Sequence, residues 1–265
     1  MSIRLKYGST ALICGGSEGI GAAFAEYLAE RGINLVIVAR RTDILNKFVS
    51  QVQEKYKVKV SAIACDLSDD NADRFILGNL NGADVDILVY NAAISFIGPF
   101  QSRSEDDYLR ASMVNMITPL KLVYSLAAKM KERGRGAIIL MSSMAGLQGS
   151  GYLAFYASTK AYNRILAESL WYEWKDSGVD IIACVAGATS TPGYYHSDPV
   201  KTSMLAPRVL RPGEIPPECF RFIGKKPSFI AGRGNRVASF FMTRLLPHKM
   251  VVKIMGSNTR KMYRL

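Results

Sequence analysis

Two ionisable side chains, Tyr156 and Lys160, stand four residues apart in the chain. Residues at this spacing share one face of a helix, so a helix here would point the phenol and the ammonium into one pocket. A phenol is a poor acid-base catalyst near neutral pH because its usual pKa is about 10. A neighbouring cation lowers that pKa and would let the oxygen exchange a proton with a carbonyl or an alcohol. The pair therefore indicates carbonyl and alcohol chemistry, although one such pair alone also occurs by chance on solvated helices.

A glycine-rich turn follows the first predicted strand. The strand covers residues 9–14, the turn runs from Gly15 to Gly21, and an amphipathic helix should continue to about Arg31. Glycines let the backbone come close to a pyrophosphate, and the first amides of the helix attract an anion. A glycine cluster elsewhere would indicate only a tight turn. Between a first strand and a first helix it favours a dinucleotide site.

The second predicted strand, residues 34–39, ends at Arg40 and Arg41. A site that prefers NAD usually holds a carboxylate here for the adenosine 2′-hydroxyl. Guanidinium groups suit a 2′-phosphate instead, so the sequence favours NADP over NAD. Glu18 in the turn weighs slightly against NADP, and the two arginines could also be ordinary solvated residues at a helix entrance.

Length and composition favour one α/β domain. The chain has 265 residues and a mass of 29.2 kDa, enough for a substantial core. Hydrophobic residues make up 49% and charged residues 21%, without low-complexity tracts or repeats, which disfavours disorder and solenoid folds. No linker rich in Pro, Gly or Ser divides the chain, so we expect a single domain over residues 1–265.

The chain carries few signals for a membrane span, a leader or a metal site. No apolar run approaches the roughly eighteen residues of a span, and the short apolar segment before Cys14 is predicted to be a strand rather than a signal peptide. The cysteines form no C-x-x-C pair and the histidines are scattered, which predicts reduced thiols, a cytoplasmic protein and no metal. These residues are Cys14, Cys65, Cys184 and Cys219, with His196 and His248.

The net charge of +12 and the pI near 9.6 fit a nucleic acid, an acidic membrane surface, or anionic substrates and cofactors. Much of the excess lies between Arg221 and Arg264. Within the basic C-terminal extension, residues 236–265, an apolar stretch with basic flanks could meet a membrane, draw in an anionic substrate, or pack as a helix on the domain or between subunits. Pro247 should end any helix there. The chain has no recognised nucleic-acid motif, so no nucleic-acid partner is expected.

With these elements in order, residues 8–235 resemble the short-chain dehydrogenase/reductase family in its single-domain form. Gly15, Gly19 and Gly21 match the family's T-G-x-x-x-G-x-G turn, with Cys14 at the usual threonine. The resemblance implies an α/β fold, a Rossmann-type doubly wound parallel sheet of about seven strands with helices on both faces.

The resemblance also implies cofactor contacts at the ends of successive strands. Asp66-Leu67 corresponds to the adenine-ring contact, and Asn91-Ala92-Ala93 to the N-A-G element with alanine in place of its glycine. After the sixth strand Ala186 replaces a proline, while Gly187 and Thr191 stay in register, and a later strand is expected at residues 228–231. The expected cofactor-binding residues are Gly15, Ser17, Glu18, Gly19, Ile20, Arg40, Arg41, Asp66, Leu67, Asn91, Ala92, Tyr156, Lys160, Gly187, Thr189 and Thr191.

Four residues match the family's catalytic set. By resemblance, Tyr156 is the general acid/base, and Ser143, thirteen residues earlier after a predicted strand over residues 137–141, hydrogen-bonds the substrate oxygen. Lys160 would lower the tyrosine pKa and hold the nicotinamide ribose, and Asn115 would hold a water in a proton relay. Taken singly, Asn115 could bridge helices, Ser143 could end a strand and Asp66 could cap a helix. Their combination with the glycine turn makes chance agreement improbable.

Substrate choice should come from a variable lid, residues 191–226, and from walls near the catalytic groups. The lid candidates are Tyr194, Tyr195, His196, Met204, Leu205, Val209 and Leu210, and the wall candidates are Ile94, Phe96, Leu147, Leu153 and Phe155. Such side chains suit a bulky apolar ketone or alcohol. The same residues could instead pack a core or a subunit surface.

The predicted function is an NADP-dependent oxidoreductase that interconverts a secondary alcohol and a ketone, with a hydroxysteroid or bile acid as the favoured substrate. One alternative is a 3-oxoacyl thioester reductase of fatty-acid metabolism. Another is a cofactor-binding regulator without turnover, which intact Ser143, Tyr156 and Lys160 disfavour. Because the family forms dimers and tetramers, the resemblance also implies a homo-oligomer.

Overall fold

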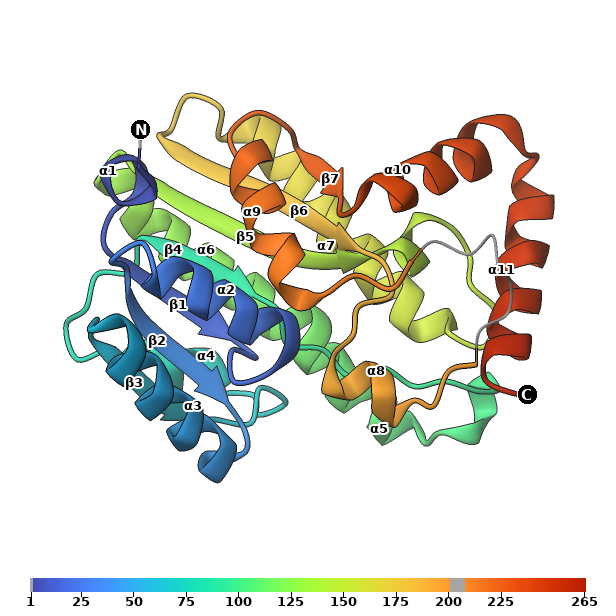
Figure 1. The fold of residues 1–265 in the computed structure, drawn as a ribbon, viewed down its shortest axis with the longest axis horizontal. Coiled ribbons are helices and arrows are strands. Elements are labelled where there is room, and N and C mark those ends of the chain that lie inside the picture. The colour runs from blue at the N-terminus through green and yellow to red at the C-terminus, as the bar shows by residue number, and fades with distance from the viewer. Residues whose placement is uncertain (1, 201–207) are drawn as a thin grey trace.

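A seven-stranded parallel sheet forms the centre of the molecule (Figure 1). The structure is a computed structural model that describes residues 2–200 and 208–265, so two lid candidates, Met204 and Leu205, lie outside the described residues. The strands are β1 (Thr10–Cys14), β2 (Asn34–Ala39), β3 (Val60–Ala64), β4 (Ile87–Tyr90), β5 (Gly136–Ser143), β6 (Val179–Ala186) and β7 (Ser228–Ile230). Their order across the sheet is β3-β2-β1-β4-β5-β6-β7. The predicted fold class is confirmed.

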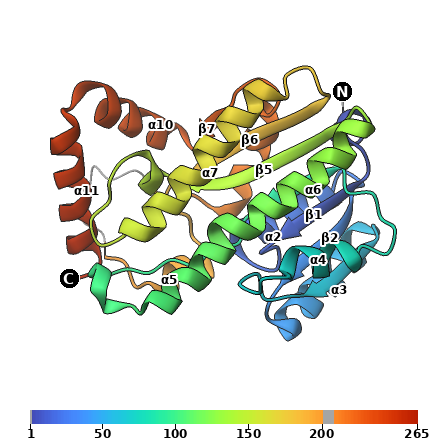
Figure 2. The ribbon, with the colours of Figure 1, turned by 180° about the vertical axis from the view of Figure 1, so that it is seen from behind.

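Helices cover both faces of the sheet, which explains why the strands are almost continuously apolar. On one face the buried residues of the strands pack against α2 (Gly19–Ala29), α3 (Thr42–Tyr56) and α9 (Ile215–Phe222) (Figure 1). On the other they pack against α4 (Ala72–Gly78), α6 (Thr118–Glu132) and α7 (Ala154–Glu173) (Figure 2). Alternate residues of each strand serve the two cores, as in Leu12 and Ile13 of β1.

Further helices complete the fold. The remaining α-helices are α1 (Ile3–Tyr7), α5 (Glu105–Ser112), α8 (Pro192–His196), α10 (Arg233–Phe240) and α11 (His248–Met262). The 3₁₀ turns are η1 (Phe100–Ser102), η3 (Met144–Leu147) and η4 (Pro212–Glu214), and the π-helical turns are η2 (Met113–Ile117) and η5 (Phe241–Leu245).

The order of the strands reverses between β1 and β4, which are neighbours in the sheet. Chain crossovers leave the sheet in opposite directions at such a point, and ligands bind in the crevice beyond the carboxyl ends of the strands. The glycine turn follows β1, and Asn91 follows β4. The fold therefore brings the predicted phosphate-binding turn and the predicted N-A-G element to one edge.

Helix α1 was not expected from the sequence, where the segment before Cys14 is predicted to be extended. Tertiary contacts hold this single short helix in place. Lys6 Nζ and Tyr7 Oη lie 2.6 and 2.7 Å from Asp180 Oδ2 on β6. Such distant partners leave no local signal in the sequence, because a helix this short is marginal on its own.

The C-terminal arm, defined as residues 233–265, comprises α10, η5 and α11. It leaves the sheet after β7 and then turns back, so that α11 ends on the side of the molecule that holds α5 and α8 (Figure 1). Pro247 is the residue before α11, which confirms that a helix boundary lies there. Among the residues that the structure describes, no helix is both long enough and apolar enough to span a membrane.

Candidate active site

The glycine turn packs backbone directly on backbone. Gly15 has a φ of +73°, in the left-handed region, and a Cβ added there would lie 2.8 Å from Ala92 Cα. A Cβ added at Gly21 would lie 2.0 Å from Gly15 O, which also accepts a hydrogen bond from Asn91 Nδ2 at 2.9 Å. Asn91 and Ala92 therefore hold the turn in shape from β4.

The start of α2 can receive an anion. Glu18 is the residue before the helix, and its side chain makes no capping hydrogen bond to the first amides. Uncapped amides at a helix start, next to a turn that tolerates no Cβ, are what a dinucleotide pyrophosphate requires. The residues present fit the cofactor that the sequence predicts. Ser17 is partly buried within the turn, and Ile20, in the first turn of α2, packs against the core.

The loop after β6 closes over this turn. A Cβ added at Gly19 would lie 2.9 Å from Thr191 Cγ2, so the two segments are in contact. Thr189 Oγ1 donates to Gly187 O at 3.0 Å, and a Cβ at Gly187 would lie 2.6 Å from Asn235 Nδ2. The structure thus brings Gly187, Thr189 and Thr191 to the predicted cofactor site.

The substitution of Ala186 for the family's proline leaves β6 intact. Ala186 ends the strand and pairs in register with Ser143, the last residue of β5. Sheet pairing fixes the backbone that the proline ring would otherwise restrain. Ser143 and the loop after β6 therefore start from paired positions at the edge of the sheet.

Charged side chains lie at the end of β2, next to the glycine turn. Arg41 forms an ion pair with Glu18, so the carboxylate that weighed against NADP has a cationic partner. Arg40 Nη1 lies 4.0 Å from Asp66 Oδ2, and Arg110 Nη2 lies 3.8 Å from the same oxygen. The Arg40 side chain is 66% exposed, which leaves its guanidinium accessible to a ligand.

The side chains of Asp66 and Leu67 differ in their exposure. Burial alone would raise the pKa of Asp66, but hydrogen bonds from Ser68 and the nearby Arg40 and Arg110 bring the pKa below its usual value. The Leu67 side chain is buried in the core, and Leu67 O accepts from Thr118 Oγ1 at 2.9 Å. The carboxylate of Asp66 is therefore the exposed side chain of this pair.

The catalytic candidates converge where β5 and α7 meet. Tyr156 and Lys160 lie on one face of α7, as their spacing predicts, and Ser143 ends β5. Ser143 hydrogen-bonds to the Tyr156 phenol and in doing so opposes a rise in its pKa. Ser143 Oγ also accepts from Ala145 N at 3.2 Å, which orients the hydroxyl at the start of η3.

Burial is the main influence on the ionisation of Tyr156 and Lys160. Burial raises the pKa of Tyr156 above 10.0, and the hydrogen bond from Ser143 is what lowers it, against a further rise caused by Tyr263. Lys160 Nζ lies 5.7 Å from the Tyr156 ring centroid and donates to Met141 O at 3.0 Å. Burial lowers the pKa of Lys160 to about 8. Burial is the largest influence on the pKa of both groups, and a lowering of the tyrosine pKa by Lys160 stays a prediction.

Asn115 lies in the π-helical turn η2, between α5 and α6. A π turn leaves carbonyls without their regular helical partners, and side chains bind two of them here. Tyr90 Oη donates to Val114 O at 2.6 Å, and Asn163 Nδ2 donates to Asn115 O at 3.1 Å. The turn is therefore held open by residues from β4 and α7.

The Asn115 side chain joins the segment after β4 to α7. Its Oδ1 accepts from Ile94 N at 2.8 Å, while Nδ2 donates to Ile94 O at 2.8 Å and to Thr159 Oγ1 at 3.1 Å. All polar atoms of the side chain are engaged, which agrees with the bridging role that the sequence left open. A role in a water relay stays a prediction.

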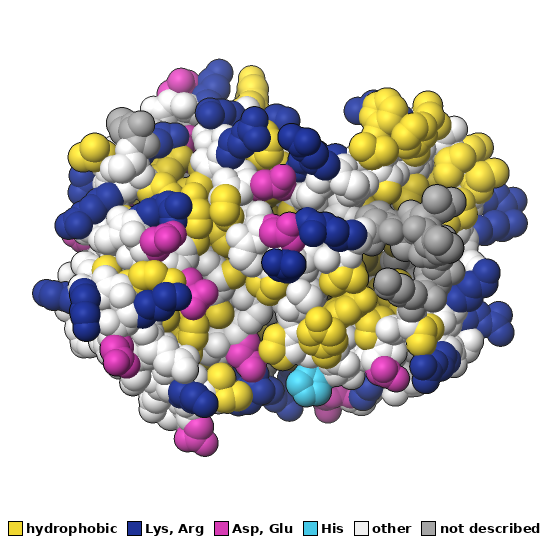
Figure 3. Space-filling model, viewed as in Figure 1, with side chains coloured by type: hydrophobic (Ala, Val, Ile, Leu, Met, Phe, Trp, Pro, Cys, Tyr) yellow, Lys and Arg dark blue, Asp and Glu magenta, His cyan; other side chains and the backbone are white. Residues whose placement is uncertain are grey.

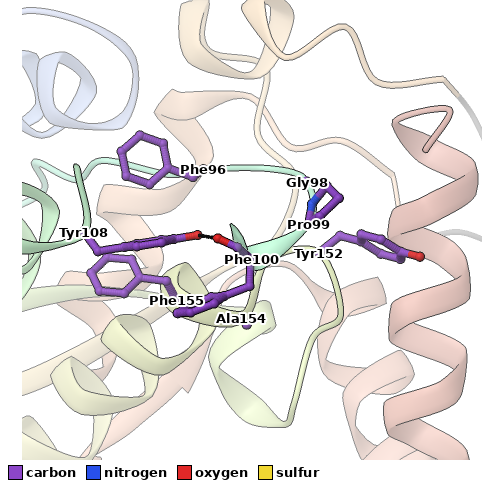
Figure 4. Close-up of a pocket in the computed structure, with 8 residues that line it drawn as sticks. All are labelled: Phe96, Gly98, Pro99, Phe100, Tyr108, Tyr152, Ala154 and Phe155. Carbon is purple, nitrogen blue, oxygen red and sulfur yellow. Dashed lines mark hydrogen bonds between the residues drawn. The ribbon is translucent and has the colours of Figure 1, made fainter. Parts of the chain in front are cut away.

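An aromatic cavity of about 170 Å³ is lined in part by Ala154 and Phe155, at the start of α7 (Figure 4). Tyr108 also lines it, with ring centroids of Phe100 and Phe155 4.8 and 5.0 Å away, and its hydroxyl donates to Phe100 O at 2.7 Å. Two predicted wall residues, Phe96 and Phe155, line it. The full lining is Phe96, Gly98, Pro99, Phe100, Tyr108, Tyr152, Ala154 and Phe155.

The predicted lid residues do not all behave as a lid. Tyr194 and Tyr195 lie on α8, where Tyr195 is 67% exposed and His196 Nδ1 lies 2.7 Å from Pro192 O. Leu210, by contrast, is buried in the core and pairs with Thr189 in an isolated bridge. Its assignment to an apolar lid is wrong because the chain after the undescribed residues returns to the edge of the sheet.

The end of the C-terminal arm supplies residues that sequence reasoning missed. Tyr263 is close enough to raise the pKa of both Tyr156 and Tyr194. Met262 O accepts from Val200 N at 2.9 Å, and Arg264 Nη1 lies 3.7 Å from Asp198 Oδ2. The arm therefore borders the catalytic tyrosine and α8, and no sequence spacing relates residues so far apart. Asn163 was also missed, although it shares the helical face of Tyr156 and Lys160.

Residues 9–198 match the family model described as short chain dehydrogenase. This match covers more than half of the chain and includes the turn, the serine, the tyrosine and the lysine. The chain belongs to the short-chain dehydrogenase family. Members of this family are oxidoreductases that use NAD(P), and the seven-stranded fold agrees with that membership.

Two relatives and one solved structure show which members of the family this chain is similar to. A 7beta-hydroxysteroid dehydrogenase from Clostridium sardiniense is 30% identical over 236 residues, which are 89% of this chain and 90% of that protein. A very-long-chain 3-oxoacyl-CoA reductase from Bos taurus is 32% identical over 176 residues, 65% of this chain and 56% of that protein. A solved structure from work on 7beta-hydroxysteroid dehydrogenase stereoselectivity has a TM-score of 0.90 at 29% identity, covering 96% of this chain and 99% of its own.

Proposed function

We propose that this protein is an NADP-dependent dehydrogenase that interconverts a secondary alcohol and a ketone on a hydroxysteroid or bile acid. The observation that carries the proposal is the grouping of Ser143, Tyr156 and Lys160 at the junction of β5 and α7. They stand at the same sheet edge as a glycine turn that tolerates no Cβ. The hydroxysteroid relative supports the substrate class, because it matches this chain over nearly its whole length.

In this mechanism Tyr156 gives a proton to the carbonyl oxygen, or takes one from the alcohol, at its phenol oxygen. Ser143 hydrogen-bonds the same substrate oxygen and orients it toward the phenol. The nicotinamide supplies or accepts the hydride when it is bound. Lys160 binds the cofactor ribose through its ammonium group, and its charge favours the phenolate when Tyr156 has lost its proton. Asn115 keeps the segment after β4 and α7 together, and we retain for it a role in the proton relay.

NADP is favoured by the charge at the end of β2. Arg41 pairs with Glu18, which removes the repulsion between that carboxylate and a 2′-phosphate. The exposed Arg40 can then bind the phosphate with its planar donors. Asp66 is already shared between Arg40 and Arg110, so a bound phosphate would compete for a guanidinium rather than meet an unpaired carboxylate.

The substrate site that we propose is bounded by the aromatic cavity, α8 and the end of α11. A cavity of about 170 Å³ is smaller than the roughly 300 Å³ or more of a typical ligand pocket, so it can form only part of a sterol site. Tyr263 adds an aromatic side chain near both Tyr156 and Tyr194, since it raises the pKa of each. The variable lid at residues 191–226 and the extension at residues 236–265 would thus act together within one domain.

A homo-oligomer is supported by exposed apolar side chains on α5, α6 and α7. These large side chains are 39–81% exposed, which is unusual for a helix surface that meets only water. They are Leu109, Leu120, Tyr124, Ile165 and Tyr172. For location we propose the cytoplasm, because all four cysteines are free thiols, three of them buried.

The test is absorbance of the reduced nicotinamide with NADP and then NAD, over hydroxysteroids, bile acids and 3-hydroxyacyl thioesters. We expect turnover of a sterol alcohol with NADP. Turnover of acyl thioesters alone would instead favour the second candidate, a 3-oxoacyl reductase, for which the bovine relative is the supporting observation. Cofactor binding without turnover of any substrate would leave a non-catalytic regulator.

A further inference from the structure

The net charge of the protein is concentrated at its C-terminal end. Eleven Lys and Arg residues follow Glu218, and no Asp or Glu follows it. The preceding 218 residues contain 23 basic and 22 acidic residues and are nearly neutral. The C-terminal arm alone carries eight of the basic residues. An anionic partner would therefore be attracted to this end of the molecule rather than to its whole surface.

Most basic side chains of the C-terminal arm form no ion pair with the part of the chain that the structure describes. Within residues 2–200 and 208–265, ion pairs engage two of the eight basic residues of the arm, Arg236 with Glu218 and Arg264 with Asp198. Arg244, Lys249 and Lys253 are exposed around the turn from α10 into α11. A single exposed charge is worth little, but several of one sign on one surface add up.

The same turn exposes large apolar side chains. Phe240 and Phe241 are 58% and 53% exposed, and Leu245 is 60% exposed. Asn235 and Ser239 are buried on the opposite side of α10, so the helix rests on the protein through small polar residues and turns its apolar ones outward. Figure 3 shows hydrophobic side chains gathered where α10 passes into α11, with Lys and Arg at their margins. We call this surface, with Val237 and Met250, the arm patch.

We propose that the arm patch docks the protein on an anionic lipid bilayer. A bilayer surface offers an apolar layer beneath negative headgroups, and the arm patch offers apolar side chains surrounded by uncompensated positive charge. A second copy of the chain fits less well. A two-fold interface centred on the arm patch would set one arm patch against another and bring two strongly basic surfaces together.

Docking would join the membrane to the catalytic end of the molecule. Helix α11 begins beside the arm patch and ends at Met262, next to Tyr263 and the catalytic tyrosine, a span of about 22 Å for its fifteen residues. An apolar substrate dissolved in the bilayer would then have a short path to the site. This last consequence rests on the proposed function, whereas docking itself does not.

The experiment is sedimentation of the full chain with vesicles of phosphatidylcholine alone and of phosphatidylcholine mixed with phosphatidylglycerol. We expect binding to the mixed vesicles only, and a loss of binding as salt is raised. The double variant Phe240→Ser/Phe241→Ser and the double variant Lys249→Glu/Lys253→Glu should each weaken binding by about tenfold or more.

Matched controls change the same residue types on other surfaces. Leu5→Ser/Phe75→Ser removes exposed apolar side chains from α1 and α4, and Lys47→Glu/Lys55→Glu reverses two exposed charges on α3. Both should bind vesicles like the unchanged chain, and thermal unfolding of all four variants shows which are folded. No cofactor or substrate enters the assay, so its result is separate from that of the turnover test.

Three results would overturn the proposal. The first is no sedimentation with mixed vesicles. The second is unchanged binding by Phe240→Ser/Phe241→Ser together with loss by Lys249→Glu/Lys253→Glu, which would indicate a general polyanion site such as one for nucleic acid. The third is a change of oligomeric state in the phenylalanine variant without a change in vesicle binding, which would assign the arm patch to a second copy.

Discussion

At the glycine turn, backbone packs on backbone, and an added Cβ at Gly21 would lie 2.0 Å from Gly15 O. In the C-terminal arm an added Cβ at Gly256 would lie 3.8 Å from its nearest neighbour, Gly151 Cα, at ordinary contact distance. The glycine turn therefore has no room for a side chain at Gly21, whereas α11 can accept a methyl group at Gly256. The difference teaches that the cofactor end is constrained by sterics, whereas the arm is defined by its charge and its exposed apolar face.

The largest effect should come from the chemistry at the sheet edge. Tyr156→Phe removes the proton donor and should lower turnover by about 10³-fold while cofactor binding is kept. The matched change in the arm, Tyr263→Phe, keeps the ring beside the site and should retain most activity. Steady-state rates and cofactor fluorescence measure both. Equal losses in the two variants would mean that the phenol of Tyr263 is needed as much as that of Tyr156, which would break the comparison.

Burial of Lys160 predicts a dependence of stability on pH. Its pKa falls from 10.5 to about 8 on folding, so between these values the unfolded chain holds a proton that the folded chain lacks. Stability should therefore rise with pH across this window, by up to about 3 kcal/mol, and the contribution is absent below pH 8. Burial raises the pKa of Cys14 and Cys65, which opposes the rise equally in all variants, so the Lys160 contribution is read as the difference between the wild type and Lys160→Met. Between pH 7 and pH 10 this difference in the free energy of unfolding, measured in urea, should shift in favour of the wild type. Lys129→Met, an exposed lysine on α6, is the control and should behave like the wild type.

Adding a methyl group at Gly21 tests the steric closure of the turn. Gly21→Ala should destabilise the protein by about 1–3 kcal/mol and abolish cofactor binding, because the new Cβ collides with Gly15 O. Gly78→Ala is the matched control, since a Cβ there meets nothing within 4 Å. Thermal unfolding and cofactor titration report the two effects. Normal cofactor affinity in Gly21→Ala would mean that the turn is not the phosphate site.

Arg40 should decide between the two nicotinamide cofactors. Arg40→Ala removes an exposed guanidinium, so it should weaken NADP(H) by about tenfold and leave NAD(H) nearly unchanged. Arg74→Ala, a basic residue on α4 away from the end of β2, is the control. Binding constants for both cofactors measure the split. A loss of the same size for NAD(H) would remove the argument for NADP.

The smallest effect is expected for a substitution in the arm, which should leave the stability of the protein unchanged or raise it slightly. Gly256 lies inside α11, where alanine is favoured over glycine by about 0.5–1 kcal/mol and meets no close neighbour. Gly256→Ala should therefore leave the melting temperature unchanged or raise it slightly. A clear fall in the melting temperature would show that α11 packs too closely on the segment at Gly151 to accept a methyl group.

Parts of the fold were predictable where the signal is local. The strand at residues 34–39 has the predicted bounds, and Pro247 marks a helix boundary as its missing N–H requires. The segment before Cys14 was only partly predicted, because α1 depends on Lys6 and Tyr7 reaching Asp180 on a distant strand. Leu210 was misassigned for the same reason, since its burial depends on pairing with Thr189.

The sequence by itself predicted the family, the sheet and the catalytic candidates Ser143, Tyr156 and Lys160. These predictions follow from spacing along one helix and from turns at strand ends. Only the tertiary structure decided how those groups ionise. Burial is a property of all the atoms around a side chain, and it raises the pKa of Tyr156 and lowers that of Lys160. The tertiary structure also brought Tyr263 to the catalytic tyrosine and turned Phe240 and Phe241 outward, since contacts between distant segments leave no periodic trace in the chain.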